Sequence, residues 1–190
     1  IIMQGYDDLL EFLDTISKAK PDRYTVHARS AILRGLSPKD NREIPPLDYD
    51  MVYKLKNDFD YLNIEINGGF KTLDSIKDAL NKVDAVMIGR VSYEDCYLLA
   101  NLYKINEENI NVNPISRGEI IKQYIPYVKE EIDRGSNIHS LAAPIQSLFQ
   151  GQPGSRKFKQ LLSSSNVKKE TLIDILNNIL EIMPSDVLWK

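Results

Sequence analysis

The strongest constraint on the fold is an alternation of strand-like and helix-like segments in the first half of the chain. The strand-like runs are YTVHAR (24–29), LNIEI (62–66) and DAVMI (84–88). Helical spacing of apolar residues marks the segments 6–17, 48–59, 73–83 and the region around 93–103. Strands that alternate with helices predict a parallel sheet, and the nearly continuous apolar character of the last strands predicts that both faces of this sheet are covered.

The second half of the chain has a different character. Periodicity is lost over 104–114, and Ser116 with Glu119 then forms a capping-box pattern for a helix that Gly135 is placed to end. Further helices are expected over 141–149, after the GQPGS turn, and over 169–182. We therefore expect an α/β domain at 1–103, a linker at 104–115 and an all-helical domain at 116–190.

Composition restricts the class of protein. The chain has 190 residues, 43% of them hydrophobic, which is enough for a buried core. No apolar run is long enough to cross a bilayer, so we expect a soluble protein with no membrane partner. The single cysteine, Cys96, excludes an internal disulfide and a cysteine zinc cluster, and we expect no metal site.

Charge is unevenly distributed along the chain. Residues 150–169 contain five Lys or Arg and no Asp or Glu, while the whole chain carries a net charge of −3. A local basic patch on an acidic protein favours a polyanion at that place, although a solvated basic helix end explains the same charges equally well.

Two of the strand-like runs end in glycine. Gly68 and Gly69 follow Asn67 and precede a helix that Thr72 is placed to cap, and Gly89 with Arg90 ends the next run. Glycine backbone amides at such a point are suited to cradle a phosphate, and an arginine supplies a planar fork of donors. A left-handed turn is an equally good explanation of the glycine pair taken alone.

These residues carry a resemblance to a known family. YTVHARSAILRGLSPKDNREIPPLDYDMVYKLKNDF, IEINGGFKTLDSIKDAL, VDAVMIGRVSYEDCYLLA and LFQGQPGSRKFKQLLS, taken in order, resemble the C-terminal part of a tRNA-dihydrouridine synthase, most closely of its A-type branch. The resemblance implies the C-terminal portion of a TIM (β/α)8 barrel, about strands six to eight, followed by an all-helical domain that holds tRNA. It implies FMN as cofactor, NADPH as reductant, and reduction of uridines in the D-loop, around position 20, to dihydrouridine.

The resemblance also implies roles for particular residues. The positions matched to FMN binding are His27, Asn67, Gly68, Gly69, Gly89 and Arg90. The positions matched to RNA binding are Arg29, Lys39, Arg42, Arg156 and Lys159. An ion pair inside the barrel explains Arg29 equally well, and Phe158 is expected in the core rather than stacked on a base.

A full barrel needs about 250 residues, whereas this chain offers three strands. The resemblance therefore implies that the N-terminal half, with the cysteine that protonates the uracil ring, lies outside the chain, and we expect residues 1–190 alone to be inactive. Cys96 falls where the family has no catalytic group, and we expect a buried or half-buried structural thiol. Three strands cut from a barrel leave two open edges and an uncovered apolar face, which predicts a partner half or self-association. A cytoplasmic location is expected, and an organellar one stays open.

Two other classes of function remain open from the residues. One is a different phosphate-binding or flavin-dependent barrel enzyme of small-molecule metabolism, which gives the basic helical tail no purpose. The other is a non-enzymatic RNA-binding module, which gives the glycine sites no purpose.

Overall fold

The computed structural model of the chain describes residues 5–30, 32, 35–105, 113–163, 167–168 and 171–189. It divides into two compact units, residues 1–89 and residues 90–190. Within the described residues no helix is both long and apolar enough to cross a membrane.

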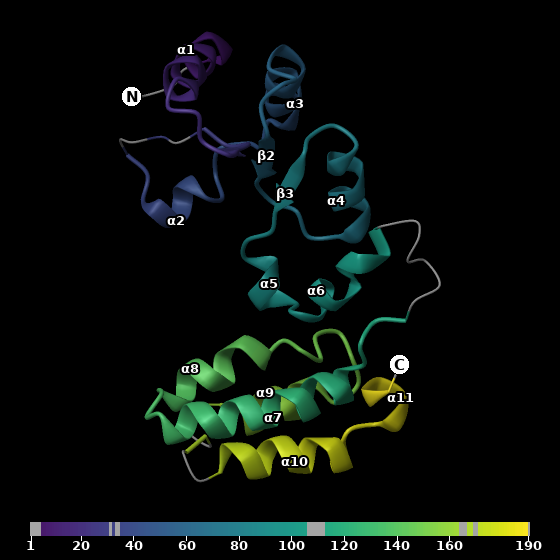
Figure 1. The fold of residues 1–190 in the computed structure, drawn as a ribbon. Helices are drawn as coiled ribbons and strands as arrows, with labels where there is room; N and C mark the ends of the chain where they lie inside the picture. The colour runs from purple at the N-terminus through teal and green to yellow at the C-terminus, as the bar shows by residue number, and fades with distance from the viewer. Residues whose placement is uncertain are drawn as a thin grey trace. The chain divides into compact units, whose positions relative to one another are not determined.

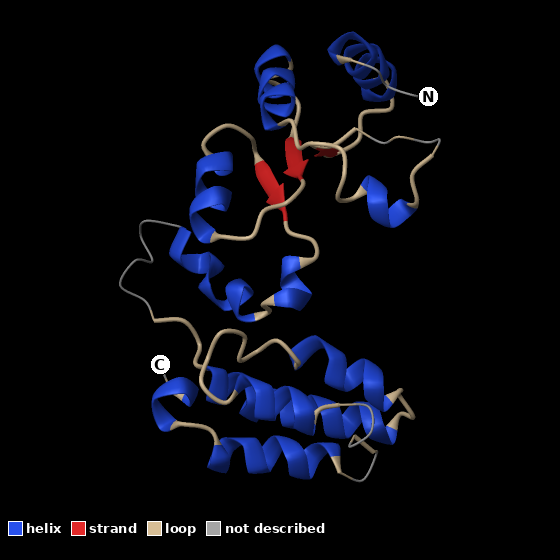
Figure 2. Cartoon of the chain, turned by 180° about the vertical axis from the view of Figure 1, so that it is seen from behind, coloured by secondary structure: helices blue, strands red, loops and turns tan. Residues whose placement is uncertain are grey.

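The first unit is built around a small parallel sheet (Figure 1). Its elements are α1 (Tyr6–Ser17), β1 (Tyr24–His27), α2 (Pro38–Asn41), α3 (Tyr49–Asp58), β2 (Ile64–Asn67), α4 (Leu73–Leu80) and β3 (Ala85–Met87). The strands pair in the order β1-β2-β3, both pairs parallel (Figure 2). The parallel α/β arrangement that the alternation predicts is confirmed.

One face of this sheet is apolar and buried. Ile64 and Ile66 of β2 are fully buried, as are Val52 and Leu55 of α3. On α4, Ile76 is also buried, and this helix packs against β3. Thr72 caps α4 by accepting a hydrogen bond from the Ser75 N–H, which fixes where the helix begins.

The opposite face of the sheet is largely polar, which corrects the expectation of a sheet apolar on both sides. Side chains two apart along a strand share a face, so the register groups them across the sheet. The members of this face are Thr25, His27, Glu65, Asn67, Ala85 and Met87. The sequence IEIN of β2 alternates apolar and polar residues, and that alternation should have predicted two unlike faces.

An acidic side chain is held on this polar face. Glu65 accepts hydrogen bonds from Thr25 Oγ1 at 2.7 Å and from Arg23 at 2.9 Å. The hydrogen bond from Thr25, followed by the one from Arg23, lowers the pKa of Glu65. The uncovered surface is therefore a hydrogen-bonded polar surface rather than an exposed apolar patch.

The second unit is helical. Its elements are α5 (Val91–Glu94), α6 (Tyr97–Asn101), η1 (Leu102–Ile105), α7 (Arg117–Asp133), α8 (Ile138–Ala142), η3 (Ala143–Ile145), α9 (Ser155–Leu161), α10 (Leu172–Ile182) and α11 (Ser185–Leu188). The long helix α7 packs against α10 and α11 (Figure 1). One hydrophobic cluster includes Tyr97 of α6, Ile121 of α7, Phe158 of α9 and Leu176 of α10. The domain boundaries at 103 and 116 stay a prediction.

Local sequence signals define both ends of α7. At its start, the Ser116 side chain accepts a hydrogen bond from the Glu119 N–H. At its end, Gly135 is in the left-handed region at φ +86°, and the Ser136 N–H bonds back to the Glu131 carbonyl at 2.9 Å. This is a Schellman ending, which only a glycine adopts without strain.

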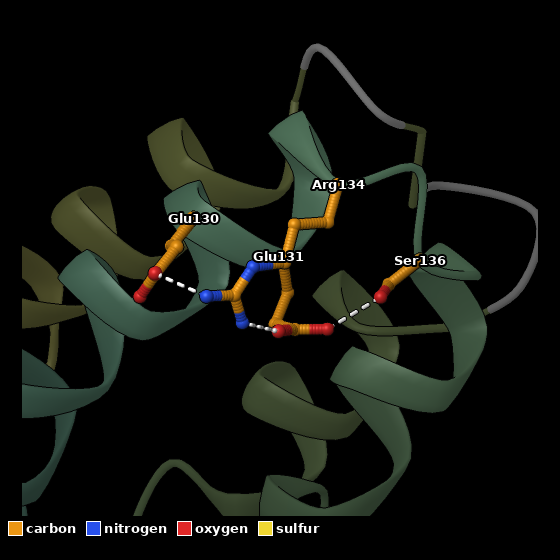
Figure 3. Close-up of polar contacts among 4 residues, drawn as sticks. All are labelled: Glu130, Glu131, Arg134 and Ser136. Carbon is orange, nitrogen blue, oxygen red and sulfur yellow. Dashed lines mark hydrogen bonds and ion pairs between the residues drawn. The ribbon is translucent and has the colours of Figure 1, made fainter.

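A polar cluster surrounds the same helix end (Figure 3). The Arg134 guanidinium bridges Glu130 at 2.6 Å and Glu131 at 2.8 Å, and the Ser136 hydroxyl donates to the other oxygen of Glu131. The hydrogen bond from Ser136, followed by that from Arg134, lowers the pKa of Glu131. Glu131 and Ser136 are half-buried, Glu130 and Arg134 are exposed, and together these groups fasten the turn that leads into α8.

Two helices expected from the sequence are interrupted. The segment around 93–103 breaks into α5 and α6 because the Cys96 N–H bonds to the buried Ser147 hydroxyl at 3.0 Å instead of continuing one helix. The helix expected at 141–149 instead starts at Ile138, where Asn137 caps it, and is followed from Ala143 by the short η3, which contains Pro144.

Candidate functional site

The parallel sheet brings the carboxyl ends of its strands to one edge. His27 pairs with Asn67 in the register of β1 and β2, and Asn67 pairs with Met87 in that of β2 and β3. The Asn67 side-chain amide lies 3.3 Å from the Met87 sulfur, which shows that both side chains lie on the same face. The glycines that follow β2 and β3 therefore leave the sheet at the same edge.

The Gly68–Gly69 turn has a backbone that side chains rarely adopt. The φ angles are +140° at Gly68 and +71° at Gly69. A Cβ at Gly68 would lie 2.7 Å from a Leu47 methyl, and one at Gly69 would lie 2.6 Å from the other Leu47 methyl. Glycine is thus required by conformation and by packing, which accounts for the turn whether or not it binds a ligand.

The same turn also has donors available for an anion. Among the described residues, none accepts a hydrogen bond from the N–H of Gly68 or of Gly69. Backbone amides in a turn with positive φ are a common anion-binding arrangement. The chemistry of this turn therefore fits a phosphate group.

Gly89 and Arg90 follow β3 and are both exposed. A Cβ at Gly89 would meet no atom within 4 Å, so packing does not require a glycine there. Arg90 is the N-cap residue of α5 and belongs to the second unit. Its role as a phosphate ligand stays a prediction.

Arg29 is engaged with the long loop that follows β1. The strand ends at His27, and Arg29 instead forms an isolated antiparallel bridge with Leu47. Its guanidinium donates to the carbonyl oxygens of Glu43, at 3.0 Å, and Pro45. Its buried Nε has no hydrogen-bond partner among the described residues. A role of Arg29 in RNA binding stays a prediction, beside this observed role in holding the loop.

Lys39 and Arg42 lie in the same loop, in a segment that is held by hydrogen bonds, and both side chains are exposed. Ser37 caps the short helix α2, on which Lys39 lies. Asn41 fastens this helix to the start of the loop, because its side chain accepts from the Ile32 N–H at 2.7 Å and donates to the Ile32 carbonyl at 2.8 Å. These hydrogen bonds therefore hold the backbone of the segment that carries both cations.

In the second unit, a basic hollow of about 750 Å³ lies at α9. Its lining residues are Gln150, Gln152, Gly154, Ser155, Arg156, Lys157, Lys159 and Gln160. Arg156 and Lys159 line it, and the Lys159 ammonium donates to the Gln150 side-chain oxygen at 2.5 Å. Their role in RNA binding stays a prediction. Lys157 and the glutamines were not expected here, because the resemblance marks only Arg156 and Lys159 in this segment.

Phe158 and Cys96 have the structural roles expected of them. Phe158 is fully buried and packs edge-on against Phe149 at 4.7 Å between ring centres. Cys96 is half-buried, and burial raises the pKa of its thiol. Across the described part of the chain, no group of three or more His, Cys, Asp or Glu side chains could hold a metal ion.

Comparison with known proteins decides the family. The sequence model of the dihydrouridine synthase (Dus) family matches residues 1–183. The chain belongs to the dihydrouridine synthase family. The resemblance inferred from the motifs is confirmed.

Named relatives give the same result. The tRNA-dihydrouridine(20/20a) synthase of Synechocystis sp. is 43% identical over 177 residues, which are 93% of this chain and 53% of that protein. The enzyme of the same name from Vibrio parahaemolyticus is 38% identical over 186 residues, covering 96% of this chain and 56% of that protein. The one from Escherichia coli K12 is 36% identical, covering 94% of this chain and 52% of that protein. The chain thus spans about half the length of these relatives.

Proposed function

We propose that this dihydrouridine synthase chain supplies part of the FMN-binding barrel and the RNA-holding helices of an enzyme that reduces uridine in tRNA to dihydrouridine. The observation that carries the proposal is the shared edge of the sheet. There His27, Asn67 and the Gly68–Gly69 turn stand together, and Gly89 leaves the next strand. In parallel β/α folds, ligands bind at the carboxyl ends of the strands.

The proposed cofactor contacts follow from chemistry at this edge. The unused amides of Gly68 and Gly69 are suited to the phosphate of FMN, with Gly89 and Arg90 as further contacts. Asn67 and His27 are suited to hydrogen-bond the remainder of the flavin. When bound, the flavin would supply the hydride and NADPH would restore it, while the protein contributes placement and exclusion of water.

The proposed RNA contacts lie in both units. Lys39 and Arg42 on the ordered loop, and Arg156 with Lys159 at the basic hollow, are exposed cations suited to phosphates. The target uridine would have to leave its stack to reach the flavin, as in other enzymes that act on bases. The names of the relatives favour uridines at positions 20 and 20a.

We further propose that the three strands are strands six to eight of the family barrel. The remaining strands would complete the open edges of β1 and β3 and cover the polar face. The proton donor would come from that part, so residues 1–190 alone should not turn over tRNA. Turnover by the purified 190-residue chain would contradict this division of labour.

The direct test is cofactor and RNA binding by the full-length protein. We expect bound FMN, released on denaturation and identified by its absorbance, and reduction of a tRNA transcript that lacks dihydrouridine when NADPH is supplied. A protein that binds tRNA but no flavin would instead support a non-enzymatic RNA-binding module. A flavoprotein that does not bind tRNA would support an enzyme of small-molecule metabolism.

The RNA contacts are tested through salt dependence. Replacing Arg156 or Lys159 by alanine should weaken tRNA binding and lower the slope of log affinity against log salt by about one for each phosphate that the side chain neutralised. Lys18→Ala is the matched control, because Lys18 is an exposed lysine paired with Asp14 on α1 and is not among the proposed RNA contacts. Equal slopes for all three variants would refute these contacts.

A further inference from the structure

A tyrosine outside the proposed cofactor contacts holds the glycine turn. The hydroxyl of Tyr49 donates a hydrogen bond to the carbonyl oxygen of Gly68 at 2.6 Å. Tyr49 is the first residue of α3, and Asp48 caps this helix by accepting from the Met51 N–H. The Tyr49 ring stacks on Phe70, with 5.1 Å between ring centres and 22° between planes. The hydroxyl is therefore placed by a helix start and by a packed ring.

This hydrogen bond sets the direction of the next amide. A trans peptide is planar, and its C=O and N–H groups point to opposite sides. Because the Gly68 carbonyl points to Tyr49, the Gly69 N–H in the same peptide points away from Tyr49. Two consecutive glycines have a wide choice of backbone angles, so an anchor on this carbonyl selects one orientation of that donor.

The packing around the turn makes the same orientation hard to leave. Leu47 lies against the positions where side chains at Gly68 and Gly69 would begin. The segment that carries Leu47 is tied to the sheet, since the Asp48 N–H bonds to the Ala28 carbonyl at 2.7 Å and the Ala28 N–H bonds to the Asn67 carbonyl at 2.7 Å. The Leu47 side chain that packs on the turn is thus linked back to the end of β2 by backbone hydrogen bonds.

The hydroxyl is also kept in its donating form. Burial raises the pKa of Tyr49, and the positive charge of nearby Arg29 offsets part of that rise. A neutral phenol donates to a carbonyl oxygen, whereas a phenolate could not.

We propose that Tyr49 is a positioning residue for the anion-binding turn: it orients the Gly69 amide toward the phosphate of FMN without touching the cofactor. The inference rests on the proposed function of the Gly68–Gly69 turn. It predicts that Tyr49 matters for ligands that carry a phosphate and not for the flavin ring system itself.

The test compares two flavins that differ in the phosphate. FMN and riboflavin are titrated into the apo form of the full-length protein, and flavin fluorescence reports binding. Tyr49→Phe keeps the ring stacked on Phe70 and removes only the hydroxyl. We expect FMN affinity to fall about 3- to 10-fold, which corresponds to the loss of one hydrogen bond, and riboflavin affinity to stay unchanged.

Tyr53→Phe is the matched control, because Tyr53 lies one turn further along α3 and its ring is 6.4 Å from that of Tyr49. It should change neither affinity. Phe70→Leu, which removes the stacked ring but keeps the Tyr49 hydroxyl, should shift FMN in the same direction as Tyr49→Phe and serves as an independent variant. Thermal unfolding of each variant records whether it folds.

The outcomes distinguish a failure of the role of Tyr49 from a failure of the proposed function. Unchanged FMN affinity in Tyr49→Phe, or equal losses for FMN and riboflavin, would show that Tyr49 only supports the fold. A wild-type protein that binds riboflavin and FMN equally well would remove the phosphate role of the turn while leaving a flavin enzyme. A wild-type protein that binds neither would overturn the proposed cofactor and this inference with it.

Discussion

The Nδ1 atom of His27 lies 3.3 Å from the point where a side chain at Gly68 would begin. This places the last residue of β1 against the turn that follows β2, with Leu47 closing the other side at 2.7 Å. The space in the Cβ direction of Gly68 is therefore already occupied. A side chain added at this position must displace Leu47 or His27, or shift the backbone.

Gly68→Ala should accordingly destabilise the first unit. The φ of +140° is strained for alanine, and the added methyl meets both Leu47 and His27. We expect a loss of about 1–3 kcal/mol in the free energy of unfolding, measured by denaturant titration. Gly89→Ala is the control, since open space surrounds that position, and it should change stability by less than about 0.5 kcal/mol. Similar losses for both variants would contradict the packing argument.

Cys96→Ser should leave uridine reduction by the full-length protein largely intact. The Cys96 backbone N–H bonds to the Ser147 hydroxyl, and burial raises the pKa of the thiol away from the thiolate form. The measurement is the rate of dihydrouridine formation under single-turnover conditions. A decrease above about a hundredfold, which corresponds to about 2.7 kcal/mol of barrier, would make Cys96 part of the reaction.

Gly118→Ala should destabilise the helical unit although alanine is the better helix former. A Cβ at Gly118 would meet the Trp189 ring at Cζ3 and would lie 2.6 Å from its Cη2, so the ring must move. We expect a net loss of about 1–2 kcal/mol by far-UV circular dichroism during denaturation. In a Trp189→Ala background the same change should instead stabilise by up to about 1 kcal/mol. An equal loss in both backgrounds would show that the ring is not the obstacle.

The helical unit should lose stability at alkaline pH through Tyr124. Burial raises the pKa of Tyr124 to about 12, and its hydroxyl donates to the Leu141 carbonyl at 2.8 Å. Because an unfolded tyrosine titrates near about 10, the contribution of Tyr124 is complete below about pH 10 and is lost as the pH rises through about 12.

The measurement is the stability difference between the wild type and Tyr124→Phe at several pH values. Trp189, the single tryptophan of the chain, reports unfolding of this unit. The wild type should be more stable by about 1 kcal/mol at pH 8, and the gap should close between pH 10 and 12. Tyr93→Phe, at an exposed position, should show no such gap. A gap that persists at pH 12 would refute the assignment.

Local patterns predicted much of this fold because local interactions decide it. The spacing of Leu9 and Leu13 set the helix at 6–17, and its bounds agree with α1. Thr72 and Ser116 were recognised as caps because a cap needs only residues three positions away. The break at Cys96 was missed because its cause, the Ser147 hydroxyl, lies 51 residues further along the chain.

The same difference between local and long-range interactions applies to the candidate site. Glycines after strands are visible in a sequence, so Gly68, Gly69 and Gly89 could be named in advance. Tyr49 could not, because its link to Gly68 spans 19 residues and nothing in the surrounding letters marks it. The strand-like run 24–29 includes Arg29, whereas β1 ends at His27, so the bonds of Arg29 to the carbonyls of Glu43 and Pro45 were not foreseen.

Asn41 and Arg29 hold the described residues of the loop after β1, which are 30, 32 and 35–48, and this bears on the rate at which the proposed RNA contacts would form. A segment that is ordered before the ligand arrives loses no further conformational entropy on binding and needs no closing step. Lys39 and Arg42 would then meet the polyanion at a fixed spacing, and their charges would act on the rate of encounter. Under the proposed function, the association rate of tRNA would then depend on diffusion and ionic strength, and not on a closing motion of this loop.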